Sequence, residues 1–199
     1  MKKYLVYLIM MVLAVPAFAA CGGDAYESEE DSEAQQPQNP EIPEGGGKVL
    51  VAYFSWSGNT QAIAERISEL TGGTLYRIEA AEPYPSDYTE CTEVALEERD
   101  SDARPAIASE VENMEEYDTV FIGCPVWWHT APMIISTFAE SYDFAGKTVV
   151  PFCTYASTYR DETLAKIVEL TPDAEHLEGF GSVSGSTDGI EIWLQRIGM

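Results

Sequence analysis

Basic residues are scarce in this sequence. Its 199 residues include 11 Lys and Arg against 34 Asp and Glu, so the formal net charge is −23. Such a chain repels nucleic acid and anionic membrane surfaces, and it attracts basic proteins. The composition therefore predicts no nucleic-acid partner. The acidity either serves solubility alone or steers a basic partner protein toward the molecule.

The sequence also lacks the common motifs for metals and nucleotides. It has two histidines and four cysteines, and no C-x-x-C pair that would indicate a zinc site. The phosphate-binding patterns G-x-x-x-x-G-K-[ST] and G-x-G-x-x-G are both absent. Six residues separate Cys153 from Arg160, one more than a C-x5-R phosphatase loop has. These absences argue against a zinc site, a Walker loop, a dinucleotide fingerprint and a phosphatase.

A run long enough to span a membrane is absent too. The most apolar stretch, Tyr4 to Phe18, is shorter than the roughly 20 residues that a spanning helix needs. It follows Lys2 and Lys3 and precedes small residues, as in a secretory signal. Residues 1–20 are therefore predicted to be a signal peptide rather than a retained anchor helix.

Two cleavage patterns overlap at the end of this signal. Ala17-Phe18-Ala19 fits the A-x-A pattern of ordinary signal peptidase, whereas Ala19-Ala20-Cys21-Gly22 resembles a bacterial lipobox, in which the cysteine is lipidated. Residues 21–47 are acidic and rich in Gln, Pro and Gly, as expected of a disordered tether. Such a tether favours lipidation of Cys21 over simple secretion. We therefore expect an exported protein, lipid-anchored to the bacterial membrane and facing outside the cytoplasm.

From Lys48 onward, short apolar runs alternate with helical patterns. Strands are predicted at residues 48–54, 74–80, 118–128, 147–153 and 177–185, and helices at 60–70, 88–99, 132–142, 161–170 and 190–197. This alternation predicts parallel pairing with right-handed crossovers. Residues 48–199 are thus expected to form one α/β domain, a three-layer sandwich with a five-stranded parallel sheet. Its 26 acidic and nine basic residues leave the domain a net charge of −17.

Ligands of such folds bind at the carboxyl ends of the strands, which here lead into three loops. The first, Ser55–Thr60, joins a strand to a helix N-terminus and offers neutral donors around Gly58, which suits a phosphate monoester. The alternative is a simple cap by Asn59 or Thr60. The loop has no lysine or arginine.

The second and third loops carry aromatic residues. Pro125–Pro132 includes Trp127 and Trp128, of which at least one is expected to meet a flat ligand, because neighbouring side chains leave an extended strand in opposite directions. His129 either donates to a ligand or lies at the rim. Thr154–Arg160 adds tyrosines and hydroxyls, either as a second wall or as an ordinary capped helix start. The polar turn 182–187 is expected to cap the last helix through Thr187 or Asp188.

Three segments, "SWSGNTQ", "YDTVFIGCPVWW" and "VVPFCT", resemble the flavodoxin family, in particular the flavodoxin-like domains of bacterial lipoproteins. The resemblance extends from about Lys48 to Met199 and implies strand order 2-1-3-4-5 and non-covalent flavin mononucleotide (FMN). The phosphate would bind the first loop, and the ring would lie against the second and meet the third. The residues implied in cofactor binding are Ser55, Trp56, Ser57, Gly58, Asn59, Thr60, Pro125, Val126, Trp127, Trp128, His129, Thr130, Thr154, Tyr155, Ala156 and Ser157.

These observations predict an electron-transfer protein that serves a redox partner protein, with no catalytic residue of its own. A flavin-dependent reductase using a nicotinamide donor and a quinone-type acceptor is the alternative, and a flavin-binding domain without turnover is a third. Because the first two loops contain no base and the domain is acidic, reduced anionic flavin should be disfavoured and its potential low. Cys124 and Cys153 are expected at neighbouring strand ends as buried thiols, because parallel strands make a disulfide awkward.

Overall fold

The computed structural model describes residues 47–199. The predicted signal peptide, Cys21 and the predicted tether up to residue 46 lie outside the described residues. Among residues 47–199, no helix combines the length and the apolar character that crossing a membrane requires.

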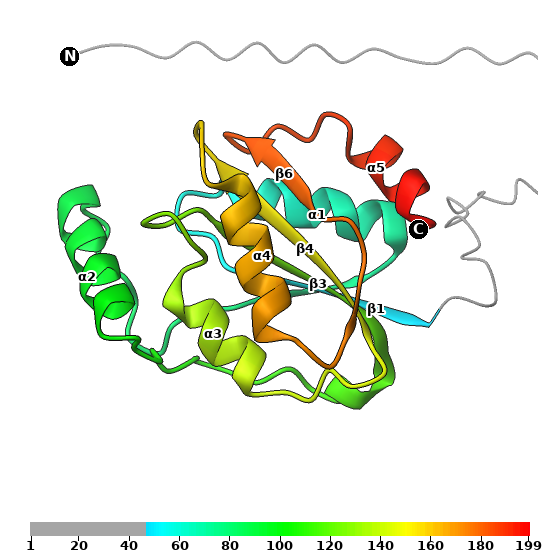
Figure 1. Ribbon diagram of the computed structural model, residues 1–199, viewed down its shortest axis with the longest axis horizontal. Helices are drawn as coiled ribbons and strands as arrows, with labels where there is room; N and C mark the ends of the chain where they lie inside the picture. The colour runs from blue at the N-terminus through cyan, green and yellow to red at the C-terminus, as the bar shows by residue number, and fades with distance from the viewer. Residues whose placement is uncertain (1–46) are drawn as a thin grey trace, which may run out of the picture. The chain divides into compact units, whose positions relative to one another are not determined.

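A parallel sheet forms the centre of the domain (Figure 1). Its strands run in the order β2-β1-β3-β4-β5, and β6 also pairs with β4. Every pairing is parallel, which confirms the predicted α/β fold and strand order. The strands are β1 (Lys48–Tyr53), β2 (Thr74–Arg77), β3 (Tyr117–Pro125), β4 (Thr148–Tyr155), β5 (Glu175–His176) and β6 (Phe180–Val183).

The fifth position of the sheet is shared by two short strands, where one strand at 177–185 was predicted. Val149 pairs with His176 and Phe152 with Phe180, so two residues of β4 face the three residues 177–179. Pro151 lies opposite this break and has no N–H to donate to a ladder. The irregularity of this edge follows from that missing donor.

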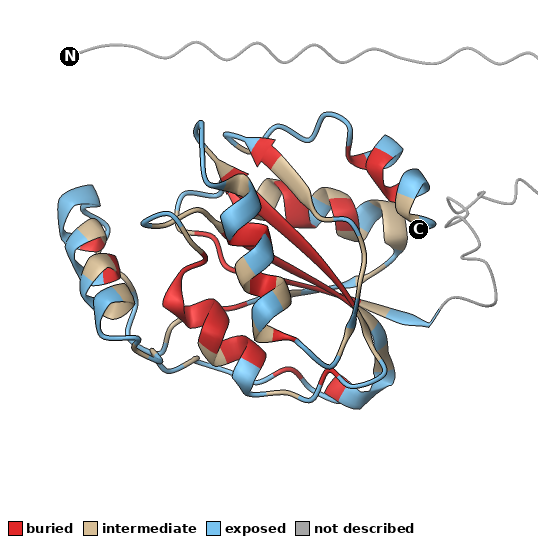
Figure 2. Cartoon of the chain, in the orientation of Figure 1, coloured by how far each residue is buried: buried red, intermediate tan, exposed pale blue. Residues whose placement is uncertain are grey.

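Helices cover both faces of the sheet, as predicted. Ile63 of α1 and Trp193 of α5 pack on one face, against Val51, Phe121 and other strand residues. Phe138 of α3 and Ile167 of α4 pack on the other face. Figure 2 shows the resulting buried layer along the strands and inner helix faces. The helices are α1 (Asn59–Thr71), α2 (Tyr88–Asp100), α3 (Met133–Glu140), α4 (Arg160–Leu170) and α5 (Ile190–Ile197), with a 3-10 turn at Met114–Glu116.

Helix α2 differs from the other helices in how little of it is buried. Only Cys91 and Ala95 of its 13 residues are buried, and it lies at the far end of the domain from α5 (Figure 1). Asp87 caps it by accepting from the N–H groups of Thr89 and Glu90. This exposed helix nevertheless takes part in the functional site.

The three cysteines of the described residues are free and buried. Cys124 of β3 and Cys153 of β4 are partners in the strand register, as expected. Burial raises the pKa of the Cys124 thiol well above its usual value and that of Cys153 to about 12. Both thiols are therefore protonated and unreactive at neutral pH.

Candidate functional site

The three predicted loops meet around one cavity of about 560 Å³ at the carboxyl ends of the strands. Of the predicted site residues, twelve line it: Trp56, Ser57, Asn59, Pro125, Val126, Trp127, Trp128, His129, Thr154, Tyr155, Ala156 and Ser157. The other four, Ser55, Gly58, Thr60 and Thr130, do not. Thr60 and Thr130 are hydrogen-bonded to the lining residues Thr154 and Trp127, and Ser55 is hydrogen-bonded to Gly58.

The first loop leaves the N-terminus of α1 open. Gly58 precedes the helix at φ 89°, and no side chain caps it. The proposed cap by Asn59 or Thr60 is therefore wrong. Ser55 is buried and its Oγ accepts from the N–H of Gly58 at 3.1 Å, which holds the loop in shape. Ser57 and Asn59 are left to face the cavity, beside helix-end N–H groups that carry a partial positive charge.

Thr60 connects the first loop to the third. Its Oγ1 lies 2.8 Å from Oγ1 of Thr154, and both residues are at least 95% buried. Thr154 itself lines the cavity at the end of β4. The side chain of Thr60 thus has a structural role beneath the cavity, and only its backbone N–H is left to bind a ligand.

The second loop makes a tight turn that the sequence did not reveal. Strand β3 ends at Pro125, not at Trp128 as predicted, because Trp127 and Thr130 exchange backbone hydrogen bonds of 2.9 and 3.1 Å. Trp128 and His129 occupy the centre of this turn at φ 44° and 73°, as in a type I′ turn. Non-glycine residues in this region are uncommon and are held there by their surroundings.

This turn separates the two tryptophans. Trp127 is half-buried between Phe54 and Tyr84, with both rings edge-on at centroid distances of 5.2 and 5.1 Å. Trp128 is 38% exposed; its indole N–H donates to the carbonyl of Thr92, and the Arg99 guanidinium lies 5.5 Å from its ring centroid. The tryptophans do diverge, but through the turn and not through an extended strand. Each offers part of its surface to the cavity.

His129 bridges the second and third loops. Its ring stacks on Tyr159 with centroids 3.9 Å apart and planes at 23°. Tyr159 precedes α4 at φ 66° without capping it, so the ordinary capped helix start is not what this loop forms. Both residues line the cavity.

Two further segments, which the sequence did not indicate, also line the cavity. Helix α2 contributes Tyr88, Cys91, Thr92 and Ala95, and the loop after β6 contributes Ser184. The acidic pattern of α2 signalled only an exposed helix, and its position beside Trp128 depends on tertiary contacts. Near Ser184, the predicted cap by Thr187 or Asp188 is wrong, since Gly189 precedes α5 without a side-chain cap.

The cavity itself is nearly neutral although the domain carries −17. Apart from His129, its lining residues within 47–199 include no acidic or basic side chain. Two arginines from outside the loops approach its walls: Arg77 donates to the carbonyl of Ser55 at 3.2 Å, and Arg99 covers Trp128. Each is paired with an acid, Glu79 or Asp100. These two arginines could not be placed at the site from the loop sequences, because neither belongs to a loop.

A partly buried polar pair supports the wall behind Trp127. The Tyr84 hydroxyl donates to Glu98 at 2.9 Å, joining the 81–87 segment to α2. Burial raises the pKa of both groups, and the neighbouring Glu98 charge raises that of Tyr84 further. Tyr84 is therefore a neutral hydrogen-bond donor at physiological pH.

A family model described as flavodoxin matches residues 48–197. The chain belongs to the flavodoxin family. No curated protein matches it at a significant level.

Several solved structures resemble this chain. A flavoprotein from Bacteroides eggerthii is 40% identical, with a TM-score of 0.68, over 77% of this chain and 99% of that one. A flavoprotein from Bacteroides uniformis is 38% identical, with a TM-score of 0.67, over 75% and 99%. A Lactobacillus acidophilus flavoprotein solved in complex with FMN is 23% identical, with a TM-score of 0.64, over 74% and 99%. The last of these shows the shared fold.

Proposed function

We propose that this protein binds FMN and carries electrons between protein partners. One observation carries the proposal: a single neutral cavity joins the uncapped N-terminus of α1 to the aromatic residues of the second and third loops. The first end suits a phosphate and the other a flat ring. The family membership and the FMN complex of the Lactobacillus relative support the same cofactor.

The residues fit FMN by the chemistry of their donors. Ser57, Asn59 and the first amides of α1 would hold the phosphate without a positive side chain, and Trp127 or Trp128 would flank the ring. Bound FMN would supply the redox chemistry. The protein would orient the flavin and set the electrostatic potential around it. Because Arg77 and Arg99 are each paired with an acid, the net negative charge of the domain would dominate that potential.

A fluorescence titration of the purified protein with FMN tests the binding. Ser57→Ala should weaken FMN by about 10-fold, because a hydrogen bond to a charged group contributes roughly 1.5 kcal/mol or more. Gln61→Ala is the matched control, since Gln61 lies on the same helix end and bonds only to Glu65. A wild-type protein that leaves micromolar FMN unbound would refute the proposal.

A reductase remains the second candidate, and the His129–Tyr159 pair favours it. These residues frame a wall of the same cavity, where a nicotinamide or quinone ring could approach. Stopped-flow mixing of the FMN-loaded protein with NADH and NADPH separates the two functions. Bleaching within seconds, with no partner protein present, would establish the reductase and exclude a pure carrier.

We also propose export and lipid anchoring at Cys21, which would place the carrier at the cell envelope. The proposal rests on the signal-like residues 1–20, the lipobox-like residues 19–22 and the acidic, Gln/Pro/Gly-rich composition of residues 21–47. Expression with a labelled fatty acid should mark the wild-type protein and leave Cys21→Ser unmarked. Label on neither protein, with both found in the medium, would show simple secretion.

A further inference from the structure

The loop after β6 meets the first loop at one corner of the cavity. Ser184 lines the cavity together with Ser57 and Asn59. The next residue, Gly185, lies directly against the start of α1: a Cβ at Gly185 would be 2.9 Å from Cα of Asn59. Ser184 is therefore one residue from a backbone contact with the first residue of α1. This is the end of the cavity at which the helix N-terminus lies.

The backbone holds Ser184 in an uncommon conformation. Ser184 and Gly185 have φ values of 55° and 80°, and a non-glycine residue in this region persists only where surrounding contacts fix it. Those contacts are present. The N–H of Ser184 donates to the carbonyl of Tyr155 at 3.1 Å, and the hydroxyl of Ser182 donates to the carbonyl of Ser186 at 2.5 Å. Ser184 is thus presented to the cavity by a loop that is already ordered.

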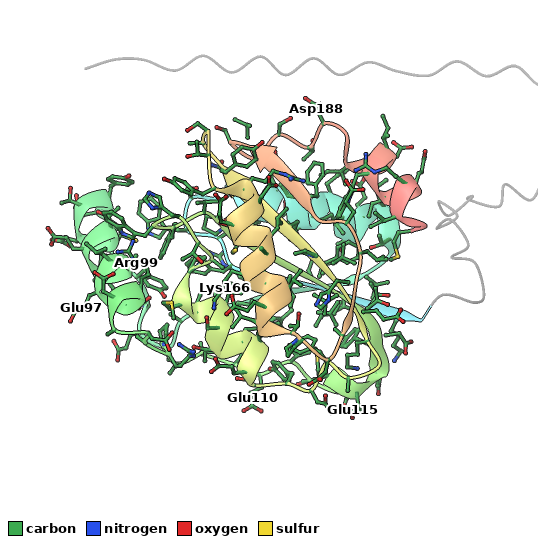
Figure 3. All side chains as sticks on the ribbon, viewed as in Figure 1. Glu97, Arg99, Glu110, Glu115, Lys166 and Asp188 are labelled. Carbon is green, nitrogen blue, oxygen red and sulfur yellow. The ribbon has the colours of Figure 1, made fainter. Side chains whose placement is uncertain are left out.

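The hydroxyl of Ser184 differs from those of its neighbours in the same loop. Ser182 and Ser186 use their hydroxyls within the loop, on the Ser186 carbonyl and on Asp188. Ser184 is exposed, and among residues 47–199 its hydroxyl has no protein hydrogen-bond partner. Asp188, the acid of this loop, points outward to solvent (Figure 3). The loop thereby offers the cavity a neutral donor and keeps its negative charge away.

We propose that Ser184 donates a hydrogen bond to the phosphate of FMN, which makes the loop after β6 a second part of the phosphate site. The inference rests on the proposed FMN binding. Its chemical reason is the lack of any Lys or Arg in the first loop. A phosphate held only by neutral groups needs several donors around it, and Ser184 adds one from a second loop to those of Ser57 and Asn59.

Two ligands that differ only in the phosphate test the inference. FMN and riboflavin are titrated by fluorescence against the full chain and its Ser184→Ala variant. Ser184→Ala should weaken FMN by about tenfold and leave riboflavin unchanged. Thr187→Ala is the matched control in the same loop, since Thr187 lies outside the cavity lining, and it should change neither affinity.

A second variant approaches the same contact through the backbone. Gly185→Ala would press on Asn59 and move Ser184 away from α1, so it should also weaken FMN selectively. Thermal melting of each apo variant checks that the fold is retained. Equal FMN affinity of wild type and Ser184→Ala would overturn the inference, as would an equal loss for FMN and riboflavin. Failure of the wild type to bind FMN would instead overturn the proposed function itself.

Discussion

The side-chain hydroxyls of Thr60 and Thr154 lie 2.8 Å apart beneath the cavity. Thr60 belongs to the first turn of α1, and Thr154, 94 residues later, is the penultimate residue of β4. Their hydrogen bond fixes the first loop relative to the third. This bond thereby fixes the distance between the N-terminus of α1 and the aromatic residues of the third loop, which come from distant parts of the chain.

Removing one of these hydroxyls should destabilise the protein. Thr60→Val leaves the Thr154 hydroxyl buried without its partner, which costs about 1–3 kcal/mol of unfolding free energy. Urea denaturation of the apo protein measures the loss. The double variant Thr60→Val/Thr154→Val removes both polar groups and should recover part of it. A single variant as stable as wild type would show that the bond contributes nothing.

Trp128 should hold α2 against the cavity. Trp128→Phe removes the hydrogen bond to Thr92 and weakens the contact with Arg99, together worth about 1–2 kcal/mol. Because α2 buries only two residues, this loss should appear locally, as roughly tenfold faster hydrogen exchange over residues 88–100. Exchange in α1 serves as the internal control and should not change. Unaltered exchange in α2 would show that Trp128 does not anchor it.

Glu98 should give the stability a particular pH dependence. Burial raises the pKa of its carboxyl above the usual 4.5, so its folded-state contribution is fully present below pH 4.5 and is lost as the pH rises through the raised pKa. Glu98→Gln can still accept from Tyr84 and carries no charge. Its unfolding free energy should therefore improve relative to wild type as the pH rises from 4.5.

The matched control for this variant is Glu97→Gln, which removes one charge from the outer face of α2 (Figure 3). Its stability should run parallel to that of wild type across the same range. Urea denaturation at several pH values measures both differences. A constant difference between wild type and Glu98→Gln would contradict the raised pKa.

Gly123 should tolerate no side chain. A Cβ at this position of β3 would overlap the ring of Phe152 on β4. Gly123→Ala is therefore expected to lower the unfolding free energy by about 1–3 kcal/mol, since overpacking forces strands or side chains apart. Phe152→Leu should be less harmful in the Gly123→Ala background than in wild type. Additive losses in this double-mutant cycle would show that the two positions do not compete for space.

The order of elements could be predicted from the sequence because it depends on local pattern. The alternation of apolar runs and helical spacing located the helices and the first four strands to within a few residues, and parallel pairing followed from it. The last predicted strand, at 177–185, is replaced by the two short strands β5 and β6. The first loop was found in the same way, as a polar turn between a strand and a helix. These features are written in consecutive residues, so they need no knowledge of distant contacts.

The walls of the cavity depended on tertiary structure. The turn at Trp127–Thr130, the position of α2 beside Trp128, and the approach of Gly185 to Asn59 all join segments through contacts distant in sequence or through unusual backbone angles. Arg77 and Arg99 likewise reach loops whose own sequences contain no base. Local pattern thus determined where a phosphate could bind, and only the packing of distant side chains decided which residues surround it.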